Sequence, residues 1–188
     1  PTAEFTIAPN PGCAGQPVCF TNTSIPGTGV NCSLTTGYTW NFGDGSPVSN
    51  IANPCHVYAL PGTYTVTLTG NNFCGSSIAT HQICITSPPT PSFTLDNTTG
   101  CVPFAVNTTN TSIDPANCGN ATYLWTVTYA AGFCGTTPSW NFTNGTTANS
   151  ISPNFIFNSP GTYTLTLAVT NPCGSFTSNQ NIIVKKPP

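Results

Sequence analysis

The sequence predicts an all-β protein whose short antiparallel strands form two tandem sandwiches. Thr, with 34 of the 188 residues, is the commonest amino acid, and its β-branched side chain favours strands over helices. The unbranched residues that favour helices are scarce, with 7 Leu, 3 Gln, 1 Glu and neither Arg nor Met. The 19 Pro and 17 Gly residues interrupt the chain too often for long elements.

The sequence contains an internal repeat. The two copies match at an offset of 88 near their starts and at an offset of 99 further on. The clearest matching blocks are residues 1–6 with 89–94 and residues 61–68 with 160–167. The larger offset indicates a net insertion of 11 residues in the second copy, between Tyr123 and Pro153.

This repeat predicts two homologous domains, residues 1–87 and residues 88–188, with the insertion around residues 128–150. The proline-rich stretch Ser87–Pro91 at their border is the predicted linker, which should be short and stiff. The first residues of the chain match those at this internal border. We therefore expect the chain to be one part of a longer array of such domains.

Within the first copy, apolar and polar residues alternate with the period of half-buried antiparallel strands. The alternation is clearest where Tyr64, Val66 and Leu68 are separated by threonines. The same signal recurs at Val18 and Phe20, at Tyr38, Trp40 and Phe42, and at Ile83 and Ile85. Turn-forming stretches lie between these runs, at Gly43-Asp44-Gly45, Leu60-Pro61-Gly62 and Cys74-Gly75. About seven short strands in about 90 residues predict an immunoglobulin-like (Ig-like) sandwich for each copy.

Side-chain charge is almost absent. Two Lys and four acidic residues give a net charge of −2, and charged residues make up 3% of the chain, against about 25% in an ordinary soluble domain. With no basic patch, a nucleic-acid partner is excluded, and the apolar runs are too short for membrane insertion. A surface of Thr, Ser and Asn lacks the self-repulsion that keeps proteins apart. We therefore predict self-association or contacts with neighbouring repeats.

The cysteines predict disulfides rather than a metal site. There are ten, an even number, without any C-x-x-C pair, and the two histidines, His56 and His81, are not spaced as zinc ligands. Five disulfides would place the protein in an oxidising compartment. We predict that it is extracellular, either secreted or on the cell surface.

Three ordered blocks in the first copy resemble the motifs of a known family. They are Trp40-Asn41-Phe42-Gly43-Asp44-Gly45, Asn53-Pro54-Cys55-His56-Val57-Tyr58 and Pro61-Gly62-Thr63-Tyr64-Thr65-Val66-Thr67-Leu68. These blocks resemble those of PKD (polycystic kidney disease) domains. The Thr/Asn-rich, Cys-bearing version is similar to tandem PKD repeats in large secreted surface proteins of Bacteroidetes. The resemblance implies an Ig-like fold in both copies.

The second copy is divergent. It keeps Tyr123-Leu124-Trp125 and the block Pro160–Leu167, but it has Phe155 and Phe157 where the first copy has His56 and Tyr58. It also lacks the Gly-Asp-Gly turn, and the insertion carries Trp140-Asn141-Phe142-Thr143-Asn144-Gly145 instead. A role of Asp44 is therefore not expected to be shared by the two copies.

Few side chains could support acid–base chemistry, and they are Glu4, Asp44, Asp96, Asp114, His56 and His81. Asp44 lies between two glycines after a strand, so we predict that it shapes a turn. One Asp per site is too few for calcium. The resemblance implies a structural hydrogen bond for His56. We predict no catalytic, metal-binding or cofactor-binding residue, no cofactor, and no enzymatic activity.

The aromatic residues of the insertion are the predicted partner surface. Rings on the regular strands, such as Tyr38, Trp40 and Phe42, share one face and are expected to enter the core. Tyr129, Phe133 and Trp140 lie in or next to the insertion and are expected to be more accessible. A protein partner or a polysaccharide could bind there.

A disulfide map follows from the order of strands and loops in an Ig-like sandwich. Loops at a common end of the sandwich suggest Cys32 with Cys74, Cys118 with Cys173, and Cys101 with Cys134. Neighbouring strands suggest Cys19 with Cys55, which leaves Cys13 for Cys84. The main rival map pairs Cys13 with Cys74 and Cys101 with Cys173, because these pairs also recur in both copies.

Taken together, these features predict a non-catalytic extracellular repeat module with a structural or adhesive role in a surface or fibre-forming protein. The alternative is a polysaccharide-binding accessory region of a secreted hydrolase. Further PKD copies in the flanking sequence would favour the first, and a glycosidase or protease domain would favour the second.

Overall fold

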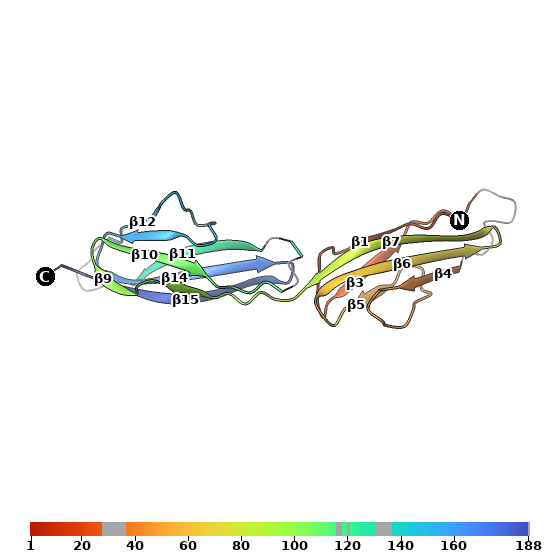
Figure 1. The fold of residues 1–188 in the computed structure, drawn as a ribbon, viewed down its shortest axis with the longest axis horizontal. Helices are drawn as coiled ribbons and strands as arrows, with labels where there is room; N and C mark the ends of the chain where they lie inside the picture. The colour runs from red at the N-terminus through yellow and green to blue at the C-terminus, as the bar shows by residue number, and fades with distance from the viewer. Residues whose placement is uncertain (28–36, 116–117, 120, 131–136, 188) are drawn as a thin grey trace. The chain divides into compact units, whose positions relative to one another are not determined.

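The computed structural model describes residues 1–27, 37–115, 118–119, 121–130 and 137–187. Within these residues the chain forms strands and turns without any helix, as the all-β prediction required (Figure 1). No described segment is therefore a helix long and apolar enough to span a membrane. The chain divides into two compact units. Unit 1 comprises Pro1–Ser87 with Pro115–Gly119, and unit 2 comprises Pro88–Asp114 with Asn120–Pro188.

Unit 1 is a sandwich of two sheets. Its strands are β1 (Phe5–Ala8), β2 (Gly12–Cys13), β3 (Pro17–Asn22), β4 (Gly37–Asn41), β5 (Cys55–Val57), β6 (Gly62–Asn72) and β7 (Gly75–Thr86). One sheet has the order β1-β3-β5 and the other has the order β2-β7-β6-β4. All pairings are antiparallel except that of β2 with β7, which is parallel. The chain thus crosses between the sheets, as in an Ig-like sandwich.

The apolar side chains of the alternating strands meet between the two sheets of unit 1. Trp40 of β4 lies opposite Leu68 of β6, which in turn lies opposite Ala79 of β7, and all three are buried. The indole Nε1 of Trp40 donates a hydrogen bond to the carbonyl oxygen of Ile51 at 2.9 Å, so the one polar atom of this ring is satisfied. Each such large buried side chain stabilises the fold by about 1.5–3 kcal/mol.

Unit 2 repeats this architecture with one additional strand. Its strands are β8 (Phe93–Leu95), β9 (Thr99–Cys101), β10 (Phe104–Asn110), β11 (Thr122–Ala130), β12 (Trp140–Thr143), β13 (Asn154–Phe157), β14 (Gly161–Asn171) and β15 (Gly174–Lys185). One sheet has the order β12-β13-β10-β8 and the other β11-β14-β15-β9. The buried Trp125 of β11 donates its Nε1 hydrogen to the carbonyl oxygen of Ser150 at 3.0 Å, as Trp40 does in unit 1.

The insertion of the second copy supplies β12, which extends the sheet beyond β13. In the register, Trp140 lies opposite Phe157 and Phe142 lies opposite Phe155. Because Trp140 and Phe142 alternate with polar residues, both rings reach the same side of the strand and pack on the core of unit 2.

The disulfide map is right for one pair and wrong for others. Cys19 of β3 is bonded to Cys55 of β5, as predicted for neighbouring strands. Cys84 is bonded to Cys118, so the predicted Cys13–Cys84 and Cys118–Cys173 bridges are both wrong. The physical reason is that Pro115–Gly119 belongs to unit 1, whereas the map assumed that each copy keeps its cysteines to itself.

Of the other described cysteines, three are disulfide-bonded and one is a free thiol. Cys13, Cys74 and Cys173 are also disulfide-bonded. Cys101 is an exposed free thiol at the end of β9, so neither the predicted Cys101–Cys134 bridge nor the rival Cys101–Cys173 bridge is present. Cys32 and Cys134 lie outside the described residues, and the Cys32–Cys74 bridge stays a prediction.

Candidate functional site

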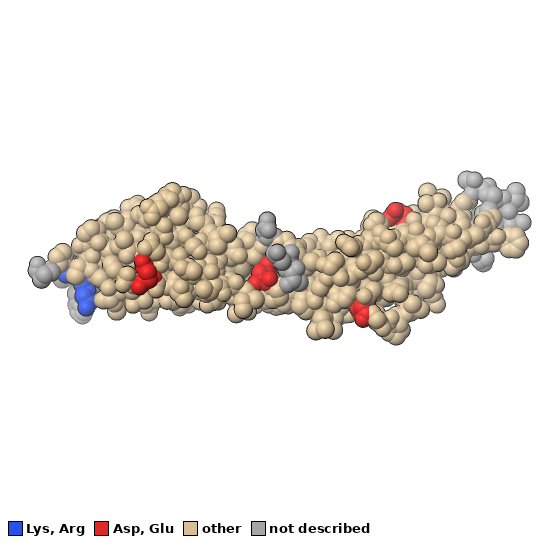
Figure 2. All heavy atoms as spheres, in the orientation of Figure 1, with Lys and Arg blue, Asp and Glu red and all other residues tan. Residues whose placement is uncertain are grey.

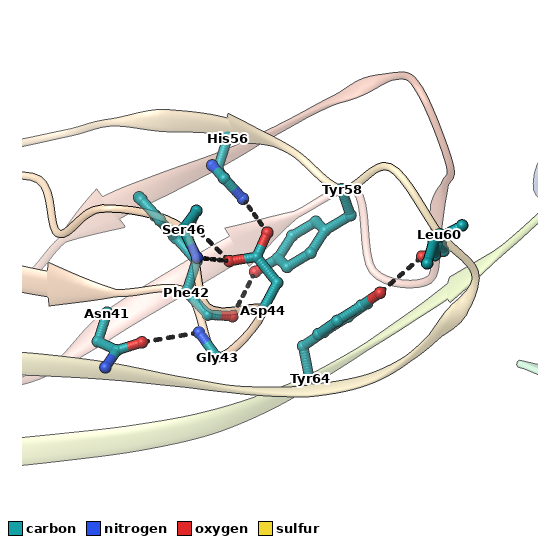
Figure 3. Close-up of polar contacts among 9 residues, drawn as sticks. All are labelled: Asn41, Phe42, Gly43, Asp44, Ser46, His56, Tyr58, Leu60 and Tyr64. Atoms are coloured by element: carbon teal, nitrogen blue, oxygen red, sulfur yellow. Dashed lines mark hydrogen bonds and ion pairs between the residues drawn. The ribbon is translucent and has the colours of Figure 1, made fainter.

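The best-defined polar cluster of unit 1 is built on the turn that follows β4. The side-chain oxygen of Asn41 accepts a hydrogen bond from the backbone N–H of Gly43 at 2.9 Å. Oδ1 of Asp44 accepts from both the backbone N–H (3.1 Å) and the hydroxyl (2.5 Å) of Ser46 (Figure 3). In each case a side-chain oxygen binds the backbone N–H of the residue two positions later, which bends the chain into a turn. The prediction that Asp44 shapes a turn is therefore confirmed.

Gly43 is required at this turn for two reasons. Its φ of 81° lies in the left-handed region, and a Cβ atom there would lie 2.3 Å from the carbonyl oxygen of Thr65 on β6. The turn therefore packs directly on the backbone of β6. Gly45 has a similar φ of 82°, but a Cβ atom there would meet no other atom within 4 Å.

His56 of β5 reaches this turn from the other sheet. Its Nε2 lies 2.7 Å from Oδ2 of Asp44, and its ring stacks on Phe42 with centroids 4.1 Å apart (Figure 3). Behind it, the fully buried Tyr58 donates its hydroxyl hydrogen to the carbonyl oxygen of Phe42 at 3.1 Å. The predicted structural hydrogen bond of His56 is thus confirmed.

The contacts of Asp44 change its acidity. Burial alone would raise the pKa of this carboxyl group, but hydrogen bonds from the Ser46 hydroxyl and the His56 ring outweigh that effect. The backbone N–H of Ser46 and the charge of His56 act in the same direction, and together they lower the pKa of Asp44 to about 2. For the buried hydroxyl of Tyr58, burial raises the pKa. Asp44 is therefore ionised and Tyr58 neutral near pH 7.

The order of the three polar groups does not match that of a nucleophilic triad. In such a triad the histidine lies between the serine and the carboxylate, where it can take the serine's proton. Here the carboxylate of Asp44 lies between Ser46 and His56 and binds both (Figure 3). The carboxylate thus links the turn after β4 to strand β5 and holds the two in a fixed orientation. Among the described residues, no three His, Cys, Asp or Glu side chains form a group that could hold a metal ion.

The depressed pKa of Asp44 makes stability depend on pH. An unfolded Asp has a pKa near 3.9, so the contribution of Asp44 is fully present above about pH 4 and is lost as the pH falls towards 2. Substitution Asp44→Asn should therefore destabilise unit 1 by about 1–2 kcal/mol at pH 7 and by much less at pH 2.5. Urea unfolding at the two pH values measures this. An equal loss at both pH values would contradict the assignment.

The other three carboxylates are also bound within their own unit. In unit 1, Oε1 of Glu4 lies 2.6 Å from Nε2 of His81, and this hydrogen bond, with that from the Phe5 N–H, lowers the pKa of Glu4. In unit 2, Asn107 donates to Asp96 at 2.7 Å, and Asn171 donates to Asp114 at 2.8 Å. Figure 2 shows how few acidic and basic atoms remain visible on the face drawn. The carboxylates thus act in the fold, and the surface around them is nearly neutral.

The described residues of unit 2 form no counterpart of the polar cluster. Phe155 and Phe157 replace His56 and Tyr58, and Phe157 packs on Tyr163 with ring centroids 4.6 Å apart. One feature is shared by both units. The Tyr64 hydroxyl donates to the Leu60 carbonyl oxygen, and the Tyr163 hydroxyl donates to that of Ser159, each at 2.8 Å. As predicted, the two copies share their packing and not the chemistry of Asp44.

The predicted aromatic partner surface stays a prediction, and two of its three residues, Tyr129 and Trp140, lie within the described part of the chain. Tyr129 packs on Tyr163 with ring centroids 5.0 Å apart and donates its hydroxyl hydrogen to the carbonyl oxygen of Pro160. Trp140 packs edge-on against Phe142 and is only partly exposed. Both rings are therefore partly buried against the core of unit 2, because Tyr129 lies on β11 and Trp140 lies on β12. Phe133 lies outside the described residues.

Sequence reasoning missed two polar contacts of unit 1, the bond of Ser46 to Asp44 and the pairing of Glu4 with His81. Ser46 could have been found, because a serine two residues after a turn Asp is a common acceptor–donor pair. The Glu4–His81 pair could not, since the two residues are 77 positions apart and neither lies in a recognisable motif.

Each unit thus consists of two packed sheets around a tryptophan, antiparallel except for one parallel pair of strands, which defines an Ig-like β-sandwich module. Family comparison is more specific. The PKD domain model matches residues 1–87, and a PKD domain model also matches residues 102–184. The chain therefore belongs to the PKD domain family, with two PKD domains in tandem. The narrower resemblance to Bacteroidetes surface proteins stays a prediction.

Known relatives share short parts of the chain. Human polycystin-1 is 43% identical over 68 residues, which cover 35% of this chain and 2% of polycystin-1. Collagenase ColA of Bacillus cereus is 66% identical over 32 residues, or 17% of this chain and 3% of the collagenase. The matched parts are therefore only a small fraction of either relative.

Solved structures show the same fold. The titin I-band fragment I67–I69 has a TM-score of 0.54 at 15% identity, covering 100% of this chain and 67% of that fragment. The eight N-terminal Ig domains of Down syndrome cell adhesion molecule give a TM-score of 0.52 at 16% identity, covering 97% of this chain and 24% of theirs. At such low identity, these likenesses show the Ig-like fold alone.

Proposed function

We propose that this chain is a non-catalytic structural or adhesive module of an extracellular protein, located at a cell surface or in a fibre. One observation carries the proposal: all four carboxylates are bound to side chains of their own unit, so the groups best suited to acid–base chemistry hold the fold together. The disulfides support an oxidising, extracellular location. The Ig-like fold shared with titin and a cell adhesion molecule supports a structural or adhesive role.

Force spectroscopy on the chain held at its two ends tests the structural role. A load-bearing module should unfold in discrete steps, one for each unit. The 36-residue separation between Cys19 and Cys55 keeps part of unit 1 closed under load. The double substitution Cys19→Ser and Cys55→Ser should therefore lengthen the unit 1 step by up to roughly 120 Å, at about 3.4 Å per residue, and leave the unit 2 step unchanged. Extension without discrete steps would contradict a load-bearing role.

The alternative function is an accessory region of a secreted hydrolase, and the 32-residue match to a bacterial collagenase favours it. A depletion assay separates the two functions. The chain is mixed with insoluble polysaccharides or with collagen fibres, and the protein left in solution is measured. A structural module should remain in solution, whereas retention by one of these solids would favour the accessory role.

A further inference from the structure

The outer face of the sheet β11-β14-β15 in unit 2 is a regular grid of small uncharged side chains. The side chains that point away from the core are the even-numbered residues of 122–130 and 162–170 and the odd-numbered residues of 175–183. We call these residues the hydroxyl face. Of the 15 positions, 9 carry a Thr or Ser hydroxyl, 2 carry an Asn amide and 4 are Leu, Ile or Ala.

The pairing of the strands aligns these side chains in rows. Thr126 lies opposite Thr166, which in turn lies opposite Asn179. Within the grid, the Thr164 hydroxyl donates to the Asn181 side chain and the Thr170 hydroxyl donates to Ser175, both at 2.9 Å. The side chains of this face are therefore mutually complementary, because a hydroxyl group both donates and accepts.

Charge does not oppose the approach of a second copy. None of the 15 positions is charged, and the charged residue nearest to them on the same strand face is Lys185, at the end of β15. The acidic residues of unit 2 are engaged by asparagines elsewhere. The face also carries two exposed apolar side chains, Leu124 (48% exposed) and Ile183 (46% exposed). Burying them against a second copy would stabilise the contact.

The composition of the face favours a copy of itself over a sugar. Sandwich faces that hold polysaccharides need exposed aromatic rings for stacking, and all 15 positions of this face are non-aromatic. From strand spacings of about 4.8 Å and about 6.7 Å per two residues, the face covers roughly 500 Å². Two faces in contact would bury about 1,000 Å², which is at the lower limit for a specific interface.

We propose that the hydroxyl face is a lateral contact surface, which pairs with the same face of a second copy of this chain. The proposal rests on the structural role proposed above and names the surface through which modules associate. A contact of this size is weak for one pair, with a dissociation constant of about 1 mM. It becomes effective when many modules are linked, because each further contact is then intramolecular.

Sedimentation equilibrium of the full chain at concentrations up to several times this value tests the proposal. The wild type should form dimers, with an affinity that changes little with salt. A face variant with Thr126→Lys, Thr166→Lys and Asn179→Lys places three like charges at the centre of the contact. It should dimerise at least tenfold more weakly. A control variant with Ala105→Lys, Thr109→Lys and Asn141→Lys, exposed on the other sheet of unit 2, carries the same net charge and should dimerise like the wild type.

A third variant separates loss of contact from loss of folding. It carries Asp at the three face positions, and its mixture with the Lys face variant should associate more tightly than either variant does alone. A monomeric wild type, equal dimerisation of both Lys variants, or no association in the mixture would overturn the proposal. Binding of the monomer to a neutral polysaccharide would reassign the face. A monomeric chain that still unfolds in discrete steps under force would reject this surface and leave the proposed structural role intact.

Discussion

Reduction is expected to lower the thermal unfolding temperature of this protein by roughly 10 °C or more, whereas raising the salt concentration from about 0.05 to 1 M should shift it by less than about 2 °C. A bridge such as Cys19–Cys55, which joins residues 36 positions apart, stabilises by about 2–4 kcal/mol, mainly by restricting the unfolded chain. In the described residues the ion pairs are His56–Asp44 and His81–Glu4, so little charge is available for salt to screen.

Scanning calorimetry with and without a thiol reductant measures this difference. The double substitution Cys19→Ser and Cys55→Ser, studied without reductant, should reproduce part of the shift and confine it to the transition of unit 1. Substitution Cys101→Ser is the matched control, because Cys101 is an exposed free thiol, and it should leave the unfolding temperature unchanged. A large response to salt together with no response to reductant would contradict the prediction.

The substitution Gly43→Ala should destabilise unit 1 by about 3 kcal/mol or more. The added Cβ atom would lie 2.3 Å from the Thr65 carbonyl oxygen, so the turn must move away from β6 in addition to accepting a left-handed backbone at a non-glycine residue. That movement would also disturb Asp44 and its contact with His56.

The matched control is Gly45→Ala, two residues away in the same turn. Its φ of 82° imposes the same backbone penalty, but its Cβ atom would meet nothing within 4 Å. We therefore expect a loss of about 1 kcal/mol. Urea unfolding of the two variants measures the difference. Equal losses would show that the approach to Thr65 does not matter and that backbone conformation alone explains the glycine.

The sequence alone was sufficient to predict the all-β fold, the core and the turn at Asp44. Alternation of Tyr64, Val66 and Leu68 with threonines reveals which side of a strand is buried, because successive side chains point to opposite faces. The turn is equally local, since Asp44 binds a residue only two positions away.

Only the tertiary structure decided which distant groups meet. The pairing of Glu4 with His81, the bonding of Cys84 to Cys118 and the packing of Trp140 on the core join residues from different strands or loops. Alternation shows which side of a strand is buried, but not which strand lies beside it. Several cysteines lie in loops at the same end of the sandwich, so the sequence allows more than one pairing among them. Such contacts depend on how whole strands and loops pack in three dimensions, and that packing leaves no local pattern in the sequence.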